Sequence, residues 1–178
     1  MIALIDIDDV LSDTINTWLK RYRSKFKHKL YPEDILSWDL TEYVVPECGN
    51  KIYDLLKSRT LYDHIKPLPH ALDGVNRLRS IGFGIAYVTG GLPEHSVHKY
   101  KWLKDHEFWQ KGDHYIQTNS KFLISGNILI DDNGKNCMEF NGMSILMNKS
   151  WNKNFNHPNR FNNWSEIIAD IDRVLGAL

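Results

Sequence analysis

Two pairs of carboxylates follow apolar segments that lie far apart in this sequence. Asp6 and Asp8 come after the apolar run at residues 2–5, and Asp131 and Asp132 come after the segment at residues 127–130. Short apolar runs of this kind are typical of buried parallel strands, whose carboxyl ends form the ligand-binding edge of an open α/β sheet. Carboxylates gathered at one edge repel one another unless a cation lies between them, and hard oxygen ligands suit Mg²⁺. The sequence therefore predicts a magnesium site.

A threonine, a glycine pair and a lysine add residues that suit phosphate chemistry. Thr89 ends another apolar run, and Gly90 and Gly91 follow it with a backbone that can approach a phosphate oxygen closely. Lys121 precedes the second acidic segment and can bring an ammonium to the same edge. Each feature also has a simpler interpretation: an aspartate that caps a helix, an ordinary strand-to-helix turn, or a solvated lysine. Their recurrence in one order favours a functional site.

Hydrophobic periodicity divides the chain into a core and an insertion. The core elements are predicted as strands at 2–5, 84–89, 115–117, 127–131 and 144–147, and as helices at 71–80, 94–105 and 164–175, the last capped by Asn163 or Ser165. This alternation predicts an α/β fold with a doubly wound parallel sheet. The core spans residues 1–11 and 65–178, with a small helical cap at 12–64 inserted after the first strand. We expect residues 148–163 to form a long polar loop.

Composition and charge exclude several classes of protein. A chain of 178 residues suits one α/β domain with a small insertion. The 22 basic and 22 acidic residues give no formal net charge, so no overall field favours long nucleic acid or an anionic membrane. We find no apolar segment that could span a bilayer and no signal-peptide pattern. Cys48 and Cys137 match no metal or redox spacing, so a reducing cytoplasm is the expected location.

The order of these residues resembles the four motifs of the haloacid dehalogenase (HAD) superfamily of phosphohydrolases. Asp6 and Asp8 correspond to the first motif, Thr89 to the second, Lys121 to the third, and Asp131 with Asp132 to the fourth. The sequence is most similar to the 5′(3′)-deoxyribonucleotidases, and this resemblance covers nearly the whole chain. It includes the segments 65–71, 99–103 and 162–167, which resemble the cap-to-core link, the stretch after the second motif and the closing helix. The resemblance implies a HAD-like Rossmannoid core and phosphatase activity.

The resemblance also implies catalytic roles that suit the residue types. Asp6 would be the nucleophile that forms an aspartyl-phosphate, and Asp8 the general acid and base. Thr89, Gly90 and Lys121 would bind phosphate, and Lys121 would also offset the repulsion between the nucleophile and its substrate. Phosphate monoesters are so inert that their enzymes supply accelerations on the order of 10²¹. Electrostatic stabilisation must provide most of this acceleration.

The implied metal ligands come from the two acidic pairs. Asp6, the backbone carbonyl of Asp8 and Asp132 would hold Mg²⁺. Asp131 would be either a further direct ligand or a support that orients Asp132 or Lys121.

Four positions depart from the pattern of the deoxyribonucleotidases. Asp9 stands where a glycine is common, and His70 replaces the glycine of a Pro-Gly-Ala link. Gly90 replaces a serine, and Asn119 stands where some relatives have a phosphate-binding arginine. The last two changes remove expected phosphate ligands.

The predicted cap is rich in aromatic residues that could hold a nucleobase. Most of these rings are expected to fill the cap interior, and Trp38 is the predicted base contact because it lies outside helical periodicity. His95 and His98 are expected to be exposed on a helix. The favoured function is a magnesium-dependent phosphatase for a nucleoside monophosphate. The alternatives are a HAD phosphatase for another small phosphometabolite or a nucleic-acid 3′ phosphate, and a catalytically silent HAD-like binding module. The sequence is compatible with a homodimer.

Overall fold

The computed structural model describes residues 1–58 and 60–176 and confirms the α/β fold. Its six-stranded sheet has the order β3-β2-β1-β4-β5-β6, and each pair of neighbouring strands is parallel. The strands are β1 (Ile2–Ile5), β2 (Gly84–Thr89), β3 (His114–Gln117), β4 (Ile128–Asp131), β5 (Met143–Met147) and β6 (Arg160–Phe161). The helices are α1 (Thr14–Phe26), α2 (Lys51–Asp54), α3 (Ala71–Ser80), α4 (Ser96–Asp105), α5 (Gly134–Glu139) and α6 (Trp164–Leu175).

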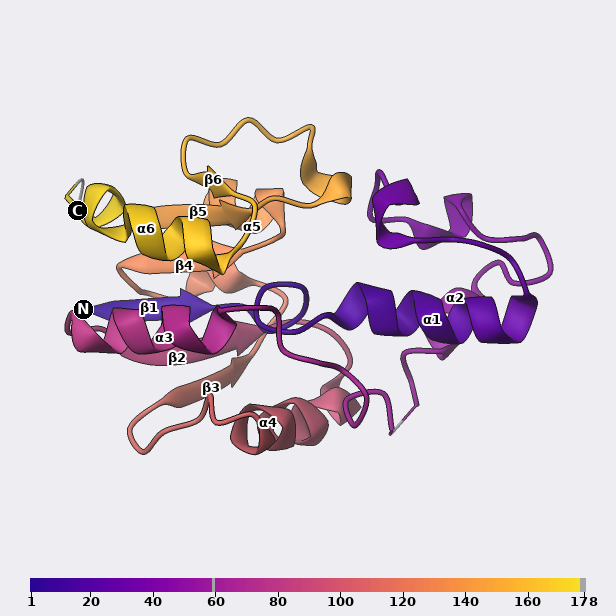
Figure 1. Cartoon of the computed structure of the whole chain (residues 1–178), viewed down its shortest axis with the longest axis horizontal. Coiled ribbons are helices and arrows are strands. Elements are labelled where there is room, and N and C mark those ends of the chain that lie inside the picture. Colours follow the sequence, from indigo (N-terminus) through magenta and orange to yellow (C-terminus); the bar gives the residue numbers. More distant parts are fainter. Residues whose placement is uncertain (59, 177–178) are drawn as a thin grey trace.

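Alternate residues of the central strands pack on opposite faces of the sheet. Ile5 belongs to a large apolar cluster that includes residues of α3, α4 and α6, whereas Leu4 belongs to a smaller cluster with Phe140, which follows α5. Helices α3 and α6 lie side by side over the first face (Figure 1), and a Cβ at Gly74 of α3 would lie 2.0 Å from the Trp164 ring of α6. Both faces of the sheet are therefore covered, which explains why the central strands β1 and β4 are apolar runs.

Several predicted elements match the observed bounds, and others do not. The prediction missed α5, a helix of six residues that begins where the Asn133 side chain accepts hydrogen bonds from the N–H groups of Lys135 and Asn136. It also missed β6, which lies inside the expected polar loop, so β5 is not the last strand. β6 has only two residues at the sheet edge, too few for a periodic signal. A 3₁₀ turn at 93–95 precedes α4, and Asn163 caps α6.

The helical insertion has a hydrophobic core of its own and lies beyond the carboxyl ends of the strands (Figure 1). Its cluster extends from Ile15 to Ile52 and includes Trp151, which lies between β5 and β6, whereas Leu61 and Tyr62 pack with the large cluster of the sheet. The two links between cap and core run side by side: Asp13 N–H donates to Lys66 O at 2.8 Å, and Leu68 N–H donates to Leu11 O at 2.7 Å. Within the described residues, no helix is long and apolar enough to cross a membrane.

Candidate active site

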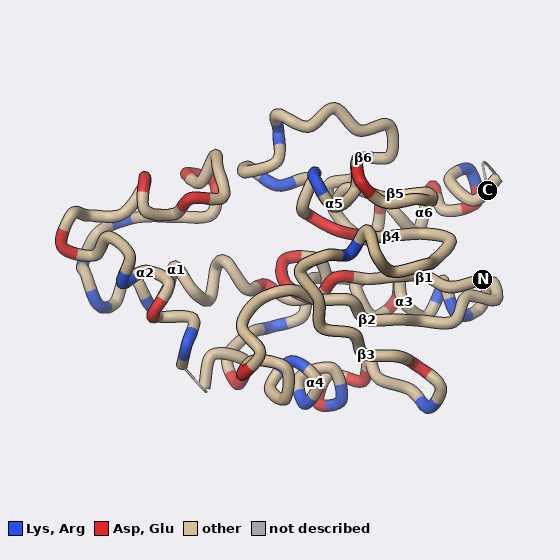
Figure 2. The backbone as a smooth tube through the Cα atoms, turned by 180° about the vertical axis from the view of Figure 1, so that it is seen from behind, with Lys and Arg blue, Asp and Glu red and all other residues tan. Residues whose placement is uncertain are grey.

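The strand order places the two acidic pairs at adjacent positions. β1 and β4 are neighbours although they are far apart in sequence, with Ile5 opposite Ile130, so the residues that follow them meet at the carboxyl edge of the sheet. The strand order reverses here, which is where doubly wound sheets bind ligands. Oxygen atoms of Asp6, Asp131 and Asp132 lie within 4.8 Å of one another, and all three residues are buried. Figure 2 shows acidic segments gathered at this end of β1, facing the cap.

Lys121 joins two of these carboxylates. Its Nζ lies 2.8 Å from Asp6 Oδ1 and 2.7 Å from Asp131 Oδ2, and its side chain is 4% exposed. Burial disfavours the ammonium, but the charges of Asp131 and Asp6 outweigh burial and raise the pKa of Lys121. The lysine is therefore a permanent positive charge at the predicted position of the phosphate.

Asp131 and Asp132 differ in the number of hydrogen bonds that their carboxylate oxygens accept. Asp131 accepts hydrogen bonds from Lys121, from the Asn133 N–H and from the Asn136 side chain. Asp132 accepts at Oδ2 from the Trp151 ring N–H at 2.9 Å. The roles of Asp132 as direct metal ligand and of Asp131 as a further ligand or a support stay predictions.

The acidic cluster fits a hard divalent cation. Burial raises the pKa of Asp6 to about 6, with Lys121 opposing the rise and Asp131 adding to it. Burial and the charges of Asp131 and Asp6 also raise the pKa of Asp132 well above its usual range. Three buried carboxylates next to one ammonium carry excess negative charge. Mg²⁺ would offset that charge, and oxygen atoms are the ligands that it prefers.

Asp8 is held by three side-chain donors. Its Oδ1 accepts hydrogen bonds from Thr14 Oγ1 at 2.8 Å and from the Tyr62 hydroxyl at 2.9 Å, and its Oδ2 lies 2.6 Å from Lys99 Nζ. Burial favours the neutral acid, but Lys99 and these hydrogen bonds outweigh burial and lower the pKa of Asp8. Asp6 and Asp8 thus have different environments, as their proposed nucleophilic and proton-transfer roles require.

Lys99 is a site residue to which the sequence analysis gave no role. It lies on α4, is 1% exposed, and donates to Thr89 Oγ1 and to Gly90 O, both at 2.7 Å. A signal was present, because Lys99 shares the buried helical face with Trp102 and Leu103, three and four residues later. A lysine on such a face needs a negative partner, and Asp8 is that partner.

The glycine turn differs from the predicted phosphate site. Thr89 is fully buried, and its hydroxyl binds Lys99. Asn119 Oδ1 accepts the Gly91 N–H at 2.9 Å, and a Cβ at Gly90 would lie 2.6 Å from that same oxygen. The two departures at Gly90 and Asn119 are therefore linked: the carboxamide occupies the space next to Gly90 and binds the neighbouring N–H. Gly90 itself lines the acidic cavity.

Asp9, a third departure, lies at the junction of the first strand segment and the cap. Its φ of +56° is in the left-handed region that favours glycine, and its carboxylate accepts the Ile15 N–H at the start of α1. Burial raises the pKa of Asp9 to about 7, and the charge of Lys149 opposes the rise. The Asp9 carboxylate thus satisfies a backbone N–H in the first turn of α1, as the side chain of an N-cap residue would.

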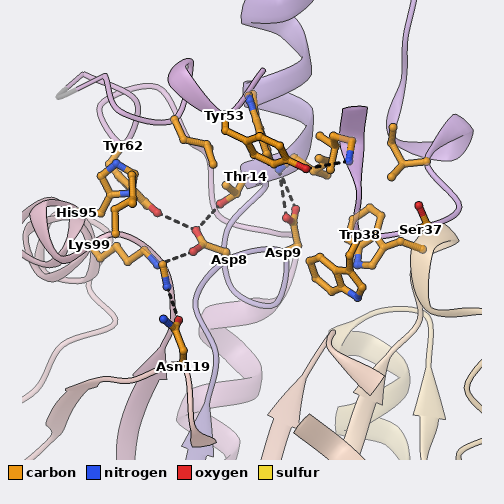
Figure 3. Close-up of a pocket in the computed structure, with 18 residues that line it drawn as sticks. Asp8, Asp9, Thr14, Ser37, Trp38, Tyr53, Tyr62, His95, Lys99 and Asn119 are labelled. Atoms are coloured by element: carbon orange, nitrogen blue, oxygen red, sulfur yellow. Dashed lines mark hydrogen bonds and ion pairs between the residues drawn. The ribbon is translucent and has the colours of Figure 1, made fainter. Parts of the chain in front are cut away.

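Two cavities meet above these residues. The acidic cavity, of about 380 Å³, contains Asp6, Lys121, Asp131 and Asp132. The apolar cavity, of about 460 Å³, lies between cap and core and is lined by Ile15, Trp18, Ile35, Leu40, Tyr53 and Leu56 among others. Both cavities are lined by Asp8, Asp9, Trp38, Gly91 and Asn119. Figure 3 shows Tyr62, His95 and Lys99 on one side of Asp8, with Asp9 and Trp38 on the other.

The structure places Trp38 at the cavities and corrects the expectation for His95. Trp38 is 48% exposed and lies edge-on to Trp151, with ring centroids 5.9 Å apart. His95 is buried rather than exposed, because it packs edge-on against Tyr62 at the base of α4. His98 is half-buried on the same helix.

The parallel sheet with a helical insertion after its first strand is similar to the fold of solved HAD family hydrolases. The fold is similar to that of a HAD family hydrolase from Deinococcus radiodurans with bound phosphate and sodium, with a TM-score of 0.60, 13% identity, and coverage of 97% of this chain and 95% of that chain. It is also similar to a hydrolase from Pseudomonas syringae, with a TM-score of 0.63, 11% identity, and coverage of 97% and 98%.

Sequence comparison identifies the family. The model of the family "5′ nucleotidase, deoxy (pyrimidine), cytosolic type C protein" matches residues 1–175. A 5′(3′)-deoxyribonucleotidase of Clostridium acetobutylicum is 36% identical over 165 residues, which cover 93% of this chain and 91% of that protein. A 5′(3′)-deoxyribonucleotidase of Bacillus subtilis is 27% identical over 171 residues, 93% and 95% of the two chains. This chain belongs to the 5′(3′)-deoxyribonucleotidase family and is a phosphatase.

Proposed function

We propose that this phosphatase dephosphorylates (deoxy)nucleoside monophosphates, that it depends on Mg²⁺, and that the phosphoryl group passes through an aspartyl-phosphate on Asp6. The observation that carries the proposal is that the acidic cavity and the apolar one lie next to each other and share five lining residues, Asp8, Asp9, Trp38, Gly91 and Asn119. A nucleoside monophosphate has the same division, with a charged phosphate at one end and a ring with apolar faces at the other. The names of the relatives from Clostridium and Bacillus agree with this substrate class.

The first chemical step uses Asp6 and Asp8. The Asp6 carboxylate forms a bond to phosphorus while the bond from phosphorus to the ester oxygen breaks, and the proton of Asp8 passes to that oxygen. Lys121 offsets the negative charge of both reactants. Lys99 favours ionised Asp8 in the free enzyme, and the negative charge of an arriving phosphate opposes this effect and favours the protonated acid.

The second step restores the enzyme. Ionised Asp8 takes a proton from water, the water oxygen attacks phosphorus, and the bond from Asp6 to phosphorus breaks to release inorganic phosphate. Asp6, the Asp8 backbone carbonyl and Asp132 would hold Mg²⁺, with Asp131 as a further ligand or as support. A bound Mg²⁺ would supply positive charge to the phosphate oxygens.

The apolar cavity would select the nucleoside. Its aliphatic and aromatic lining suits a base better than the hydroxyl-rich body of a sugar phosphate, and Trp38 is the proposed stacking surface. A different small phosphometabolite and a nucleic-acid 3′ phosphate stay as the alternative substrates. The catalytically silent module loses support because the chain is a phosphatase by family. A cytoplasmic location and a homodimer stay predictions.

A substrate screen tests the proposal. Turnover of deoxynucleoside and ribonucleoside 5′- and 3′-monophosphates would be compared with that of sugar phosphates and a 3′-phosphorylated oligonucleotide, with Mg²⁺ and after chelation. We expect the highest kcat/KM for a nucleoside monophosphate and loss of turnover after chelation. A sugar phosphate or the oligonucleotide as best substrate would contradict the proposed substrate, and full turnover in chelator would contradict the metal dependence.

A further inference from the structure

We propose that the hydroxyl of Tyr62 is a positioning group for Asp8, which fixes the carboxylate so that its Oδ2 transfers the proton. The inference rests on the proposed function, in which Asp8 acts as general acid and base. Its geometric basis is the distribution of donors over the two oxygens of one carboxylate (Figure 3).

Oδ1 of Asp8 is fully occupied. It accepts two hydroxyl donors, Thr14 at 2.8 Å and Tyr62 at 2.9 Å, and a carboxylate oxygen has about two acceptor sites. Among the described residues, the donor to Oδ2 is Lys99 Nζ at 2.6 Å, which leaves one acceptor site on that oxygen. A proton that moves between Asp8 and a reacting oxygen is therefore carried on Oδ2, provided that both hydroxyls stay on Oδ1. Without these two hydrogen bonds the carboxyl group can rotate, so that Oδ1 and Oδ2 exchange positions.

Tyr62 is itself held in one orientation. It is 6% exposed, its ring packs edge-on to His95 with centroids 5.8 Å apart, and Lys99 Nζ lies 6.0 Å from the ring centroid. Its hydroxyl donates to Asp8 Oδ1 at 2.9 Å, because a carboxylate oxygen can only accept. A fixed ring with a permanent donor suits the orientation of a carboxylate.

The two hydroxyls come from the two links between cap and core. Thr14 begins α1 on the outgoing link, and Tyr62 lies on the returning link. The links are joined to each other by the hydrogen bond from Asp13 N–H to Lys66 O. The orientation of Asp8 therefore depends on both links, and the active form of the acid requires the cap to be in place.

The test is Tyr62→Phe, which removes the hydroxyl and keeps the ring. Turnover would be measured on a series of phosphate esters from p-nitrophenyl phosphate, whose leaving group needs little protonation, to alkyl phosphates, whose leaving group needs a proton. We expect kcat/KM, which reports the step in which the leaving group departs, to fall by roughly 10- to 100-fold for alkyl phosphates and much less for p-nitrophenyl phosphate. Thr14→Val, which removes the other donor, should change the series in the same direction and provides the test if Tyr62→Phe does not fold.

Two further variants separate the outcomes. Tyr87→Phe removes another buried tyrosine hydroxyl, which donates to Phe108 O at 2.6 Å, and should leave the leaving-group dependence unchanged. Asp8→Asn should steepen that dependence more than Tyr62→Phe does. If the leaving-group dependence is unchanged in Tyr62→Phe and Thr14→Val but steeper in Asp8→Asn, the positioning role of Tyr62 is wrong and the acid role of Asp8 stands. An unchanged dependence in Asp8→Asn would overturn the proposed acid role of Asp8 and the inference with it.

Discussion

Truncation of Trp38 tests whether the cap contributes a base contact or only packing. A packed tryptophan buries up to ~250 Å², and Trp38 is 48% exposed. Removal of the ring therefore eliminates about half of that buried apolar area, ~130 Å². At ~25 cal/mol per Å² this corresponds to a loss of at most ~3 kcal/mol of unfolding free energy, or ~2 kcal/mol if the unfolded chain is compact. Trp38→Ala should lower the melting temperature by roughly 4–8 °C.

The kinetic effect of the same change should depend on the substrate. Loss of a base stack worth ~1–3 kcal/mol lowers kcat/KM for nucleoside monophosphates by roughly 5- to 150-fold relative to p-nitrophenyl phosphate. Trp38→Phe should retain much of the preference, and Leu36→Ala, at an exposed residue of the same loop, serves as the control. A Trp38→Ala protein that melts normally and keeps its preference for nucleotides would refute the stacking role. A far larger fall in melting temperature, with equal losses on all substrates, would identify a packing role.

Three further changes follow from the contacts of the site. Lys99→Met should move the basic limb of the pH dependence of kcat/KM to higher pH, because the first step needs protonated Asp8 and the ammonium that lowers the pKa of Asp8 is gone; an unmoved limb would contradict this. Gly90→Ser should lower kcat/KM because the new Cβ would clash with the Asn119 side chain. The double variant Gly90→Ser, Asn119→Ala should recover part of the kcat/KM lost in Gly90→Ser, whereas additive losses would contradict the contact between the two positions. The unfolding free energy of the metal-free protein, measured by urea denaturation, should fall as pH rises from about 4 to 7. Burial raises the pKa of Asp6 to about 6 and that of Asp9 to about 7 in the folded state. The contribution of these two groups to stability is therefore complete only below their unfolded pKa of 3.8, and it is lost as pH rises through their folded values. Mg²⁺ should flatten that fall, and equal slopes with and without Mg²⁺ would contradict a metal at this cluster.

The parts of the fold that could be predicted are those with a strong local signal. β2 is a mostly apolar run that ends at Thr89, and α3 carries a regular apolar face, so the predicted bounds of both agree with the structure. β6 has only two residues and owes its place to pairing with β5, which is a tertiary interaction. The α5 helix depends on a single asparagine cap within a polar stretch.

The candidate site shows the same division between local and tertiary information. Asp6 and Asp131 could be paired from sequence because strand ends meet at one edge. The donors on Asp8 could not, because Thr14, Tyr62 and Lys99 come from three segments whose meeting depends on the cap links and on the register of α4. The pairing of Asn119 with Gly91 likewise depends on contact between two separate loops.

Direct detection of the phosphorylated enzyme tests the central claim most sharply. The protein would be mixed with a radiolabelled nucleoside monophosphate and Mg²⁺, quenched in acid during turnover, digested, and analysed for a labelled peptide, with Asp6→Asn and Asp8→Asn treated in parallel. We predict label on Asp6 in the wild-type enzyme, none in Asp6→Asn, and label in Asp8→Asn that is lost more slowly because the water lacks its base. Turnover by Asp6→Asn at the wild-type rate, or label on a residue other than Asp6, would contradict the mechanism.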